Sequence, residues 1–257
     1  MTRTEGDVTR AFVSLASSLV AGDDVVDLLA ELTVDCVRLL DIGSAGLLLA
    51  DEHGVLHVMA ASSERTRELE VFQVQRDDGP CRDCYLTGRP VSVPDLAQMT
   101  ERWPQFAPHA LEAGFASVHA VPMRLRTNVL GAMGLFGTTV GSLEPDDLDL
   151  AQGLADVASV ALVQDRASND SNAINAQLQT ALSTRVVLEQ AKGLLAQQGD
   201  LDMEAAFSVL RRYGRDRNLR LTDLAQAVVA RELPAQLLLD HDRSRTVSPR
   251  TARPPRR

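Results

Sequence analysis

Residues 178–229 constrain the fold of this chain most, because their breakers and apolar positions predict three short helices in succession. A run rich in Ala, Leu, Gln and Glu extends without a breaker over residues 174–198 and stops at Gly199. Asp202 is the expected N-cap of a second helix and Thr222 that of a third. Helices this short are stable only when their apolar faces pack together, so the stretch predicts a small helical bundle.

Basic side chains concentrate on the second of these helices. Arg211 and Arg215 are four residues apart and share a helix face, and Arg212 is adjacent to them. Together with Lys192 of the first helix they supply the charge needed to hold phosphates. The same residue types also make an ordinary solvated face, and composition alone favours that simpler interpretation.

The order of residues favours the functional interpretation. The relevant segments are Arg185-Val-Val-Leu-Glu-Gln-Ala-Lys-Gly-Leu-Leu, Glu204-Ala-Ala-Phe-Ser-Val-Leu-Arg-Arg-Tyr and Asn218-Leu-Arg-Leu-Thr-Asp-Leu-Ala. In their order and spacing they resemble the ANTAR domain, the RNA-binding module of transcription antitermination regulators. The resemblance implies an all-α three-helix bundle over residues 178–233. It also implies that the bundle binds hairpins in nascent RNA and favours readthrough.

The resemblance points to one RNA-contact region on this bundle. Its basic members can neutralise phosphates, and its small members would let a backbone or a looped-out base approach the first helix. Its aromatic member could stack on such a base, although it also fits the apolar face of its helix. The residues concerned are Arg185, Ala191, Lys192, Gly193, Arg211, Arg212 and Tyr213.

Charge is distributed unevenly along the 257 residues. Residues 1–177 carry 12 Lys and Arg against 26 Asp and Glu, a net charge of −14. Residues 178–239 carry a net charge of +1, and residues 240–257 carry +4. A polyanion is therefore expected to contact the C-terminal third, through hairpin shape more than bulk charge. The tail, residues 234–257, is rich in Arg and Pro and is expected to be disordered.

The N-terminal two thirds read as a sheet domain with helices. Apolar patterning predicts helices over residues 10–20 and 24–40, followed by a β-hairpin. A middle region of loops and short elements and then two adjacent strands are expected after it. A closing helix is expected from Pro145 to at least Arg166. This order predicts an α+β antiparallel sheet domain over residues 8–166. Residues 1–7 are expected to form a tail, and residues 167–177 a helical linker or hinge.

Short motifs in this region resemble those of a GAF domain, most closely GAF domains fused to ANTAR domains in actinobacteria. They are Gly79-Pro-Cys, Thr87-Gly-Arg-Pro-Val, Asp95-Leu, Arg102-Trp-Pro, Gly114-Phe, Val121-Pro-Met-Arg-Leu, Gly131-Ala-Met-Gly-Leu-Phe and Asp156-Val-Ala. The resemblance implies a central sheet with helices on one side and a small-molecule pocket on the other. It does not identify the ligand, and no cofactor can be named.

Two sets of residues in this region could carry chemistry. Cys81 and Cys84 form a C-x-x-C pair that a helix start and an Arg could make redox-active, although two ordinary cysteines fit better. Aromatic and sulfur-containing side chains could line a pocket or simply fill the core. The pocket candidates are Phe72, Cys81, Trp103, Phe106 and Met133. The scattered histidines indicate no metal site, and we find no catalytic grouping.

These patterns predict a signal-responsive, non-enzymatic RNA-binding regulator. The N-terminus has no signal-peptide pattern and no apolar run is long enough to span a bilayer, so a cytoplasmic protein without a membrane partner is expected. An apolar seam between Asp146 and Gln198 predicts a homodimer. Contact with the transcription machinery would be indirect. In the alternative, the helical bundle serves only dimerisation or protein contact.

Overall fold

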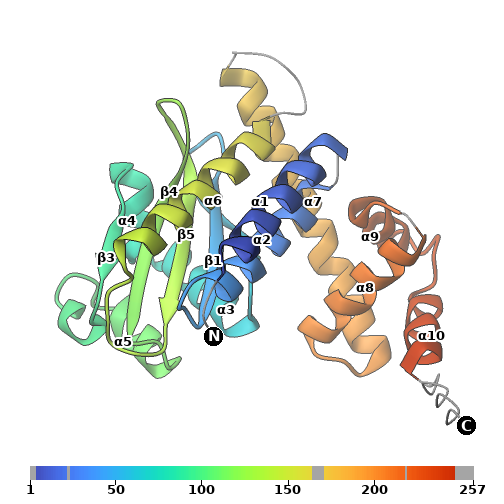
Figure 1. The fold of residues 1–257 in the computed structure, drawn as a ribbon. Coiled ribbons are helices and arrows are strands. Elements are labelled where there is room, and N and C mark those ends of the chain that lie inside the picture. Colours follow the sequence, from blue (N-terminus) through green and yellow to red (C-terminus); the bar gives the residue numbers. More distant parts are fainter. Residues whose placement is uncertain (1–3, 22–23, 164–170, 218, 247–257) are drawn as a thin grey trace, which may run out of the picture. The chain divides into compact units, whose positions relative to one another are not determined.

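The computed structural model describes residues 4–21, 24–163, 171–217 and 219–246. It divides into two compact units, residues 1–185 and 186–257 (Figure 1). The first unit contains the sheet and the second is helical. The expected α+β sheet domain followed by a helical region is therefore confirmed.

A five-stranded antiparallel sheet in the order β2-β1-β5-β4-β3 forms the centre of the first unit. Its strands are β1 (Ser44–Ala50), β2 (Leu56–Ala61), β3 (Val91–Val93), β4 (Ser117–Leu125) and β5 (Asn128–Gly137). Side chains of the central strands are buried almost throughout, because helices cover both faces of the sheet.

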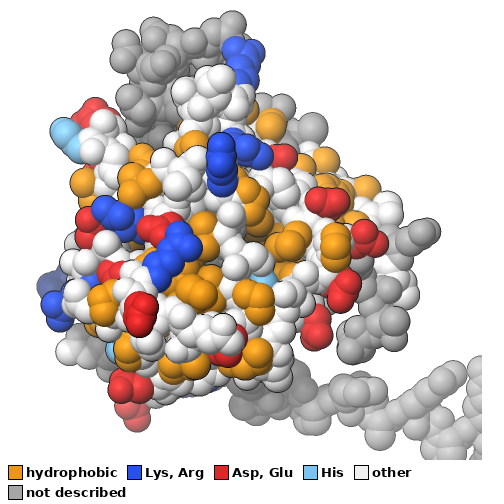
Figure 2. All heavy atoms as spheres, turned by 90° about the vertical axis from the view of Figure 1, so that its left-hand side faces the viewer, with side chains coloured by type: hydrophobic (Ala, Val, Ile, Leu, Met, Phe, Trp, Pro, Cys, Tyr) orange, Lys and Arg blue, Asp and Glu red, His pale blue; other side chains and the backbone are white. Residues whose placement is uncertain are grey.

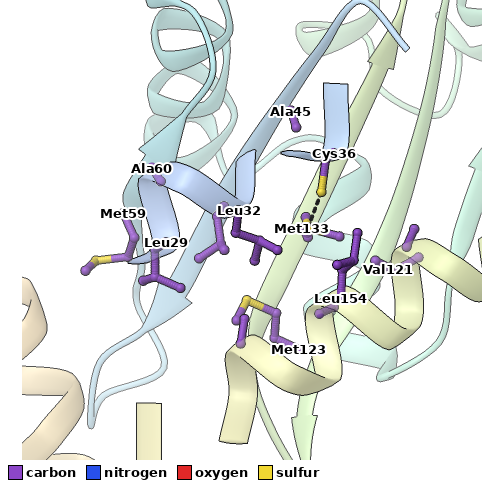
Figure 3. Close-up of a cluster of buried hydrophobic side chains, with 14 of the residues drawn as sticks. Leu29, Leu32, Cys36, Ala45, Met59, Ala60, Val121, Met123, Met133 and Leu154 are labelled. Carbon is purple, nitrogen blue, oxygen red and sulfur yellow. Dashed lines mark hydrogen bonds between the residues drawn. The ribbon is translucent and has the colours of Figure 1, made fainter. Parts of the chain in front are cut away.

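One face of the sheet is covered by α2 (Val25–Leu39) and α6 (Pro145–Val163), and α1 (Glu5–Ala21) packs against these two helices (Figure 1). Asp24 caps α2 by accepting a hydrogen bond from the Val26 N–H at 2.9 Å. The core on this face joins leucines of α2 and α6 to methionines of the sheet (Figure 3). Within it, the Cys36 sulfur lies 3.6 Å from the Met133 sulfur, which places Met133 on this face.

The opposite face carries α3 (Glu64–Arg76), α4 (Pro80–Thr87), the 3₁₀ turn η1 (Leu96–Met99) and α5 (Phe106–Glu112). Ser63 caps α3, and Gly88, in the left-handed conformation, ends α4. The expectation of helices on one side only is therefore wrong. Alternate strand residues point to opposite faces, and both sets here are apolar and need cover.

The second unit contains the C-terminal part of α7 together with three further helices. The helices are α7 (Ser171–Gly199), α8 (Met203–Arg217), α9 (Leu221–Val229) and α10 (Ala235–Thr246). The Asp202 carboxylate accepts the Ala205 N–H at 2.7 Å, as expected for the start of α8. Thr222 is not the cap of α9, because the extended Arg220 ends the loop earlier and lets Leu221 enter the core.

The expectation of a disordered tail from residue 234 is wrong for residues 235–246, which form α10. Ala235, Leu238 and Leu239 recur at helical spacing and are buried, and α10 packs against α8. Residues 247–257 lie outside the described residues, as do 1–3 of the expected tail and 167–170 of the expected linker. Residues 5–7 already belong to α1, because Thr4 and Asp7 cap its first turn reciprocally.

Candidate RNA interface and sensor core

The side chains of Lys192 on α7 and Arg211 on α8 meet at the ring of Phe207. The Lys192 ammonium lies 5.5 Å from the ring centroid, and the Arg211 guanidinium carbon lies 5.6 Å from it. Both separations fit cation–π attraction. The partly exposed ring thus gathers two positive charges at the junction of the two helices.

Lys192 is enclosed rather than open to solvent. The residue is 5% exposed, and its Nζ donates to the two carboxylate oxygens of Glu189 at 3.2 and 3.3 Å. Burying an ammonium is costly unless it is paired, and Glu189 provides that pairing one turn away on the same helix. Lys192 therefore has a structural partner already, and its charge is directed toward Glu189 and Phe207.

A second charged cluster joins α8 to α10. The Arg212 guanidinium forms an ion pair with the Asp242 carboxylate, and His241 Nε2 lies 2.9 Å from an Asp216 oxygen. The His241 ring meets the Tyr213 ring edge-on at 5.3 Å, and Arg217 lies 4.6 Å over the Tyr213 ring. Tyr213 itself is buried, so α10 closes over this side of α8.

In the first unit, a polar cluster is buried between the sheet and α3. The Glu70 carboxyl group accepts hydrogen bonds from the Gln73 amide and from the Cys81 thiol, whose sulfur lies 3.7 Å away. The Cys81 N–H donates to Gln73 Oε1 at 3.2 Å. Glu70 lies against Gly46 and Gly134, where an added Cβ would come within 2.5 and 2.7 Å of Oε1. Those two glycines create the space that this carboxyl group fills.

Burial controls the protonation of this cluster. It raises the pKa of Glu70 to about 8. The hydrogen bonds from Gln73 and Cys81 lower this pKa, but they offset only part of the effect of burial. Burial likewise raises the pKa of Cys84 to about 12 and that of Cys81 well above its ordinary value. Both thiols are therefore protonated at neutral pH and are poor nucleophiles. This environment favours two ordinary core cysteines over a redox pair.

The surface beside this core is mixed in charge. Figure 2 shows basic, acidic and apolar side chains interspersed over one face of the molecule. Arg102 pairs with Asp83 at 2.8 Å, and the Trp103 indole N–H donates to the same carboxylate at 3.2 Å. Among the described residues, we find no group of three or more His, Cys, Asp or Glu that could hold a metal ion.

Comparison with known protein families identifies the first unit. The GAF domain family matches residues 22–163, more than half of the chain. The chain belongs to the GAF domain family. A second match, to the ANTAR domain, covers residues 176–229. These matches identify the GAF and ANTAR domains and carry no information about an actinobacterial lineage. Among curated proteins, none matches the chain significantly.

Several solved GAF domains are similar to the first unit. One, from a phosphoenolpyruvate-protein phosphotransferase of Coxiella burnetii, is 14% identical, with a TM-score of 0.49 over 61% of this chain and 92% of that one. Another, from the corresponding Acinetobacter protein, is 13% identical, with a TM-score of 0.47 over 60% of this chain and 91% of that one. In the part of the chain that the structure describes, no helix is both long and apolar enough to cross a membrane.

The ANTAR-matched helices bring together only part of the expected contact set. Arg211 and Lys192 meet at Phe207, and Arg212 lies on the neighbouring side of α8. Gly193 is exposed, and an added Cβ there would meet nothing within 4 Å. Ala191 is fully buried and Tyr213 is 4% exposed, so both are core residues in this structure. Arg185 lies on α7 in the first unit.

Sequence reasoning missed Phe207 and the α10 residues His241 and Asp242. Phe207 was identifiable, since it precedes Arg211 by four residues and so shares its helix face. Asp242 carried no such signal, because it lies in a segment whose composition favours disorder.

The GAF residues expected to line a pocket are only partly brought together: Trp103 and Phe106 meet edge-on, with ring centroids 6.2 Å apart. Met133 contacts Cys36 on the α2 face, whereas Cys81, Trp103 and Phe106 belong to the opposite face. This separation follows from strand alternation, since Met133 and its neighbour Gly134 point to opposite faces of β5. Phe72 is partly exposed and stacks on His109, with ring centroids 4.1 Å apart. Met133 is therefore removed from the candidate pocket set.

Proposed function

We propose that this protein is a signal-responsive regulator that binds hairpins in nascent transcripts and promotes transcription antitermination. The observation that carries the proposal is the ANTAR match over residues 176–229, which coincides with helices α7, α8 and α9. The GAF unit would supply the sensing function, with a small molecule or another signal as input. Because nascent transcripts are the target, the site of action would be the cytoplasm.

The charged side chains of α8 are the best candidates for direct RNA contact. Arg212 is 39% exposed at its side chain, enough to reach a phosphate, and Arg211 extends from the same helix beside Phe207. Direct RNA contact is not expected from Lys192, Ala191 or Tyr213, because these residues are buried and hold the helices together. Gly193 offers an exposed backbone position on α7, and Arg185 adds a charge two turns earlier on that helix.

Binding of a structured RNA tests the proposal. A stem–loop can be selected with the full-length protein from a pool with a constant stem and a randomised loop, and its affinity measured at several salt concentrations. The double variant Arg211→Ala, Arg212→Ala should bind it at least about tenfold more weakly, with a salt slope reduced by about two. Arg231→Ala removes the same kind of charge at the far end of α9 and should leave affinity within about twofold.

Two outcomes would contradict the proposal. Selection might enrich no stem–loop over single-stranded RNA, in which case the helical unit serves dimerisation or protein contact. Alternatively, the double variant might bind as tightly as the parent while circular dichroism shows a normal fold, which would place the RNA site elsewhere.

We further propose that the protein works as a homodimer and not as an enzyme. Val160 of α6 is 40% exposed and Val186 of α7 is 57% exposed, and both belong to the segment in which the apolar seam was expected. Exposed valines on helices are candidates for burial against a second copy. A sensor of this kind would transmit its signal by binding alone, through the dimer and the RNA.

A further inference from the structure

The fourth helix of the second unit brings a carboxylate to an arginine of the candidate RNA site. Asp242 of α10 pairs with Arg212 of α8, thirty residues earlier in the sequence. The two side chains are 24% and 39% exposed, so the pair lies at the surface and remains accessible to a competing anion. A carboxylate and a phosphate bind a guanidinium through the same paired N–H geometry, so they compete for it.

The position of Asp242 is fixed independently of Arg212. Leu238 and Leu239 are buried at 0% and 3% exposure and anchor α10 to the unit. His241, the residue before Asp242, contacts both Asp216 and the Tyr213 ring. Asp242 is therefore held beside Arg212 by packing, and it would stay there if the ion pair were broken.

We propose that Asp242 competes with RNA phosphate for Arg212, so that α10 limits the affinity of the RNA site. This inference rests on the proposed function, since it assumes that Arg212 contacts RNA. Binding exchanges the Asp242 carboxylate for a phosphate oxygen at Arg212. Breaking the Arg212–Asp242 pair costs free energy, and this cost is subtracted from the gain of the new Arg212–phosphate contact.

The size of the effect follows from the exposure of the pair. Exposed ion pairs contribute little to stability, so the loss of one is expected to change the RNA-binding constant by about two- to fivefold. Asp242→Asn keeps the side-chain shape and removes the charge, so it should tighten hairpin binding by about this factor. The salt slope should steepen by no more than about one, because a single phosphate contact is strengthened.

The test uses the full chain and the selected stem–loop described above. Asp240→Asn is the matched control, because Asp240 lies on the same helix but contacts Gln236 and Arg243 within α10. Asp240→Asn changes the net charge by the same amount but leaves the Arg212–Asp242 pair in place, so it measures the effect of bulk charge alone. We expect it to change the affinity by less than about half as much as Asp242→Asn does. The double variant Asp242→Asn, Arg212→Ala should bind no better than Arg212→Ala alone, because the gain acts through Arg212. Asp242→Ser provides a second removal of the charge if the Asn variant melts early.

The outcomes separate this inference from the proposed function. If the parent binds the stem–loop and Arg212→Ala weakens it, but both Asp242 variants bind as the parent does, the competition is refuted and the RNA site stands. Equal gains from Asp240→Asn and Asp242→Asn would reduce the effect to bulk charge and also refute it. If neither the parent nor the Asp242 variants bind structured RNA, both the function and the inference are wrong.

Discussion

The Cys81 thiol lies 3.7 Å from Oε1 of Glu70, in a layer where both groups are fully buried. Because the thiol donates and the carboxyl accepts, the contact is stable only while Cys81 keeps its proton. Glu70 keeps its own proton over much of the neutral range, since burial raises its pKa to about 8. The interior of the GAF unit therefore holds an acid and a thiol that are both neutral at physiological pH.

The first prediction concerns the pH dependence of stability. The folded pKa of Glu70 is about 8, above its ordinary value of 4.5, so the folded state binds this proton more tightly. The stabilisation is fully present below pH 4.5 and is lost as pH rises through about 8, at about 1.4 kcal/mol per pH unit within that window. Glu70→Gln should remove this slope from the free energy of unfolding, measured by urea denaturation from pH 5 to 9.

Glu68→Gln is the control for that experiment, because Glu68 is an exposed residue of the same helix. Its pH profile should follow that of the parent. A Glu70→Gln profile parallel to that of the parent would show that Glu70 is ionised in the folded state.

The second prediction concerns thiol chemistry. Burial raises the pKa of Cys84 and of Cys36 to about 12 and raises the pKa of Cys81 well above its ordinary value, so few thiolates form at neutral pH. In the folded protein at pH 7.5, all three should react with a thiol reagent at least about a hundredfold more slowly than in urea. The double variant Cys81→Ser, Cys84→Ser should leave RNA binding insensitive to oxidant, as in the parent. An oxidant response that the parent shows and this variant loses would instead establish a redox switch.

The third prediction concerns Lys192. Its ammonium is paired with Glu189 and enclosed, so removing the charge should affect folding more than phosphate contact. Lys192→Met retains the apolar stem and should lower the melting temperature of the second unit while leaving the salt slope of hairpin binding unchanged. Arg212→Ala should do the reverse, with a near-parental melting temperature and a shallower slope. A salt slope that falls equally in both variants would show that Lys192 reaches RNA.

The fourth prediction concerns assembly. If the exposed valines of α6 and α7 are covered by a second copy, the double variant Val160→Lys, Val186→Lys should dissociate the dimer at micromolar concentration. Sedimentation velocity measures this directly. Val55→Lys, at a valine that is 50% exposed in the β1–β2 turn, should leave the assembly unchanged. A parent that sediments as a monomer with and without RNA would contradict the dimer.

Much of the fold was predictable because its determinants are local. Asp24, Ser63 and Asp202 each cap a helix by a side-chain contact within three residues, and Gly88 supplies the left-handed turn after α4. The strands were found from their apolar runs for the same reason. Signals of this kind depend only on residues that are close in the sequence, so they can be recognised without the tertiary structure.

The parts that sequence reasoning missed depend on distant partners. Met133 was wrongly included among the pocket residues. The face of the sheet to which its side chain points is fixed by strand register, which composition does not encode. Lys192 was expected to neutralise phosphates, but it is buried beside Phe207 of the next helix. The segment 235–246 was expected to be disordered, and it is a helix because its leucines pack against α8, a contact that composition does not reveal. In each case the deciding contact crosses between elements.

The position of α10 also determines which fragment can be moved between proteins. The ANTAR match ends at residue 229, but Leu238 and Leu239 are buried, and a side chain at Gly199 would collide with Leu239. A fragment cut at residue 229 would expose the residues that pack against those leucines to water. Because exposed apolar surfaces promote aggregation, we expect such a fragment to aggregate. A domain exchange that preserves the behaviour of this module should therefore be cut after Thr246. The smallest transplantable piece is longer than its family signature.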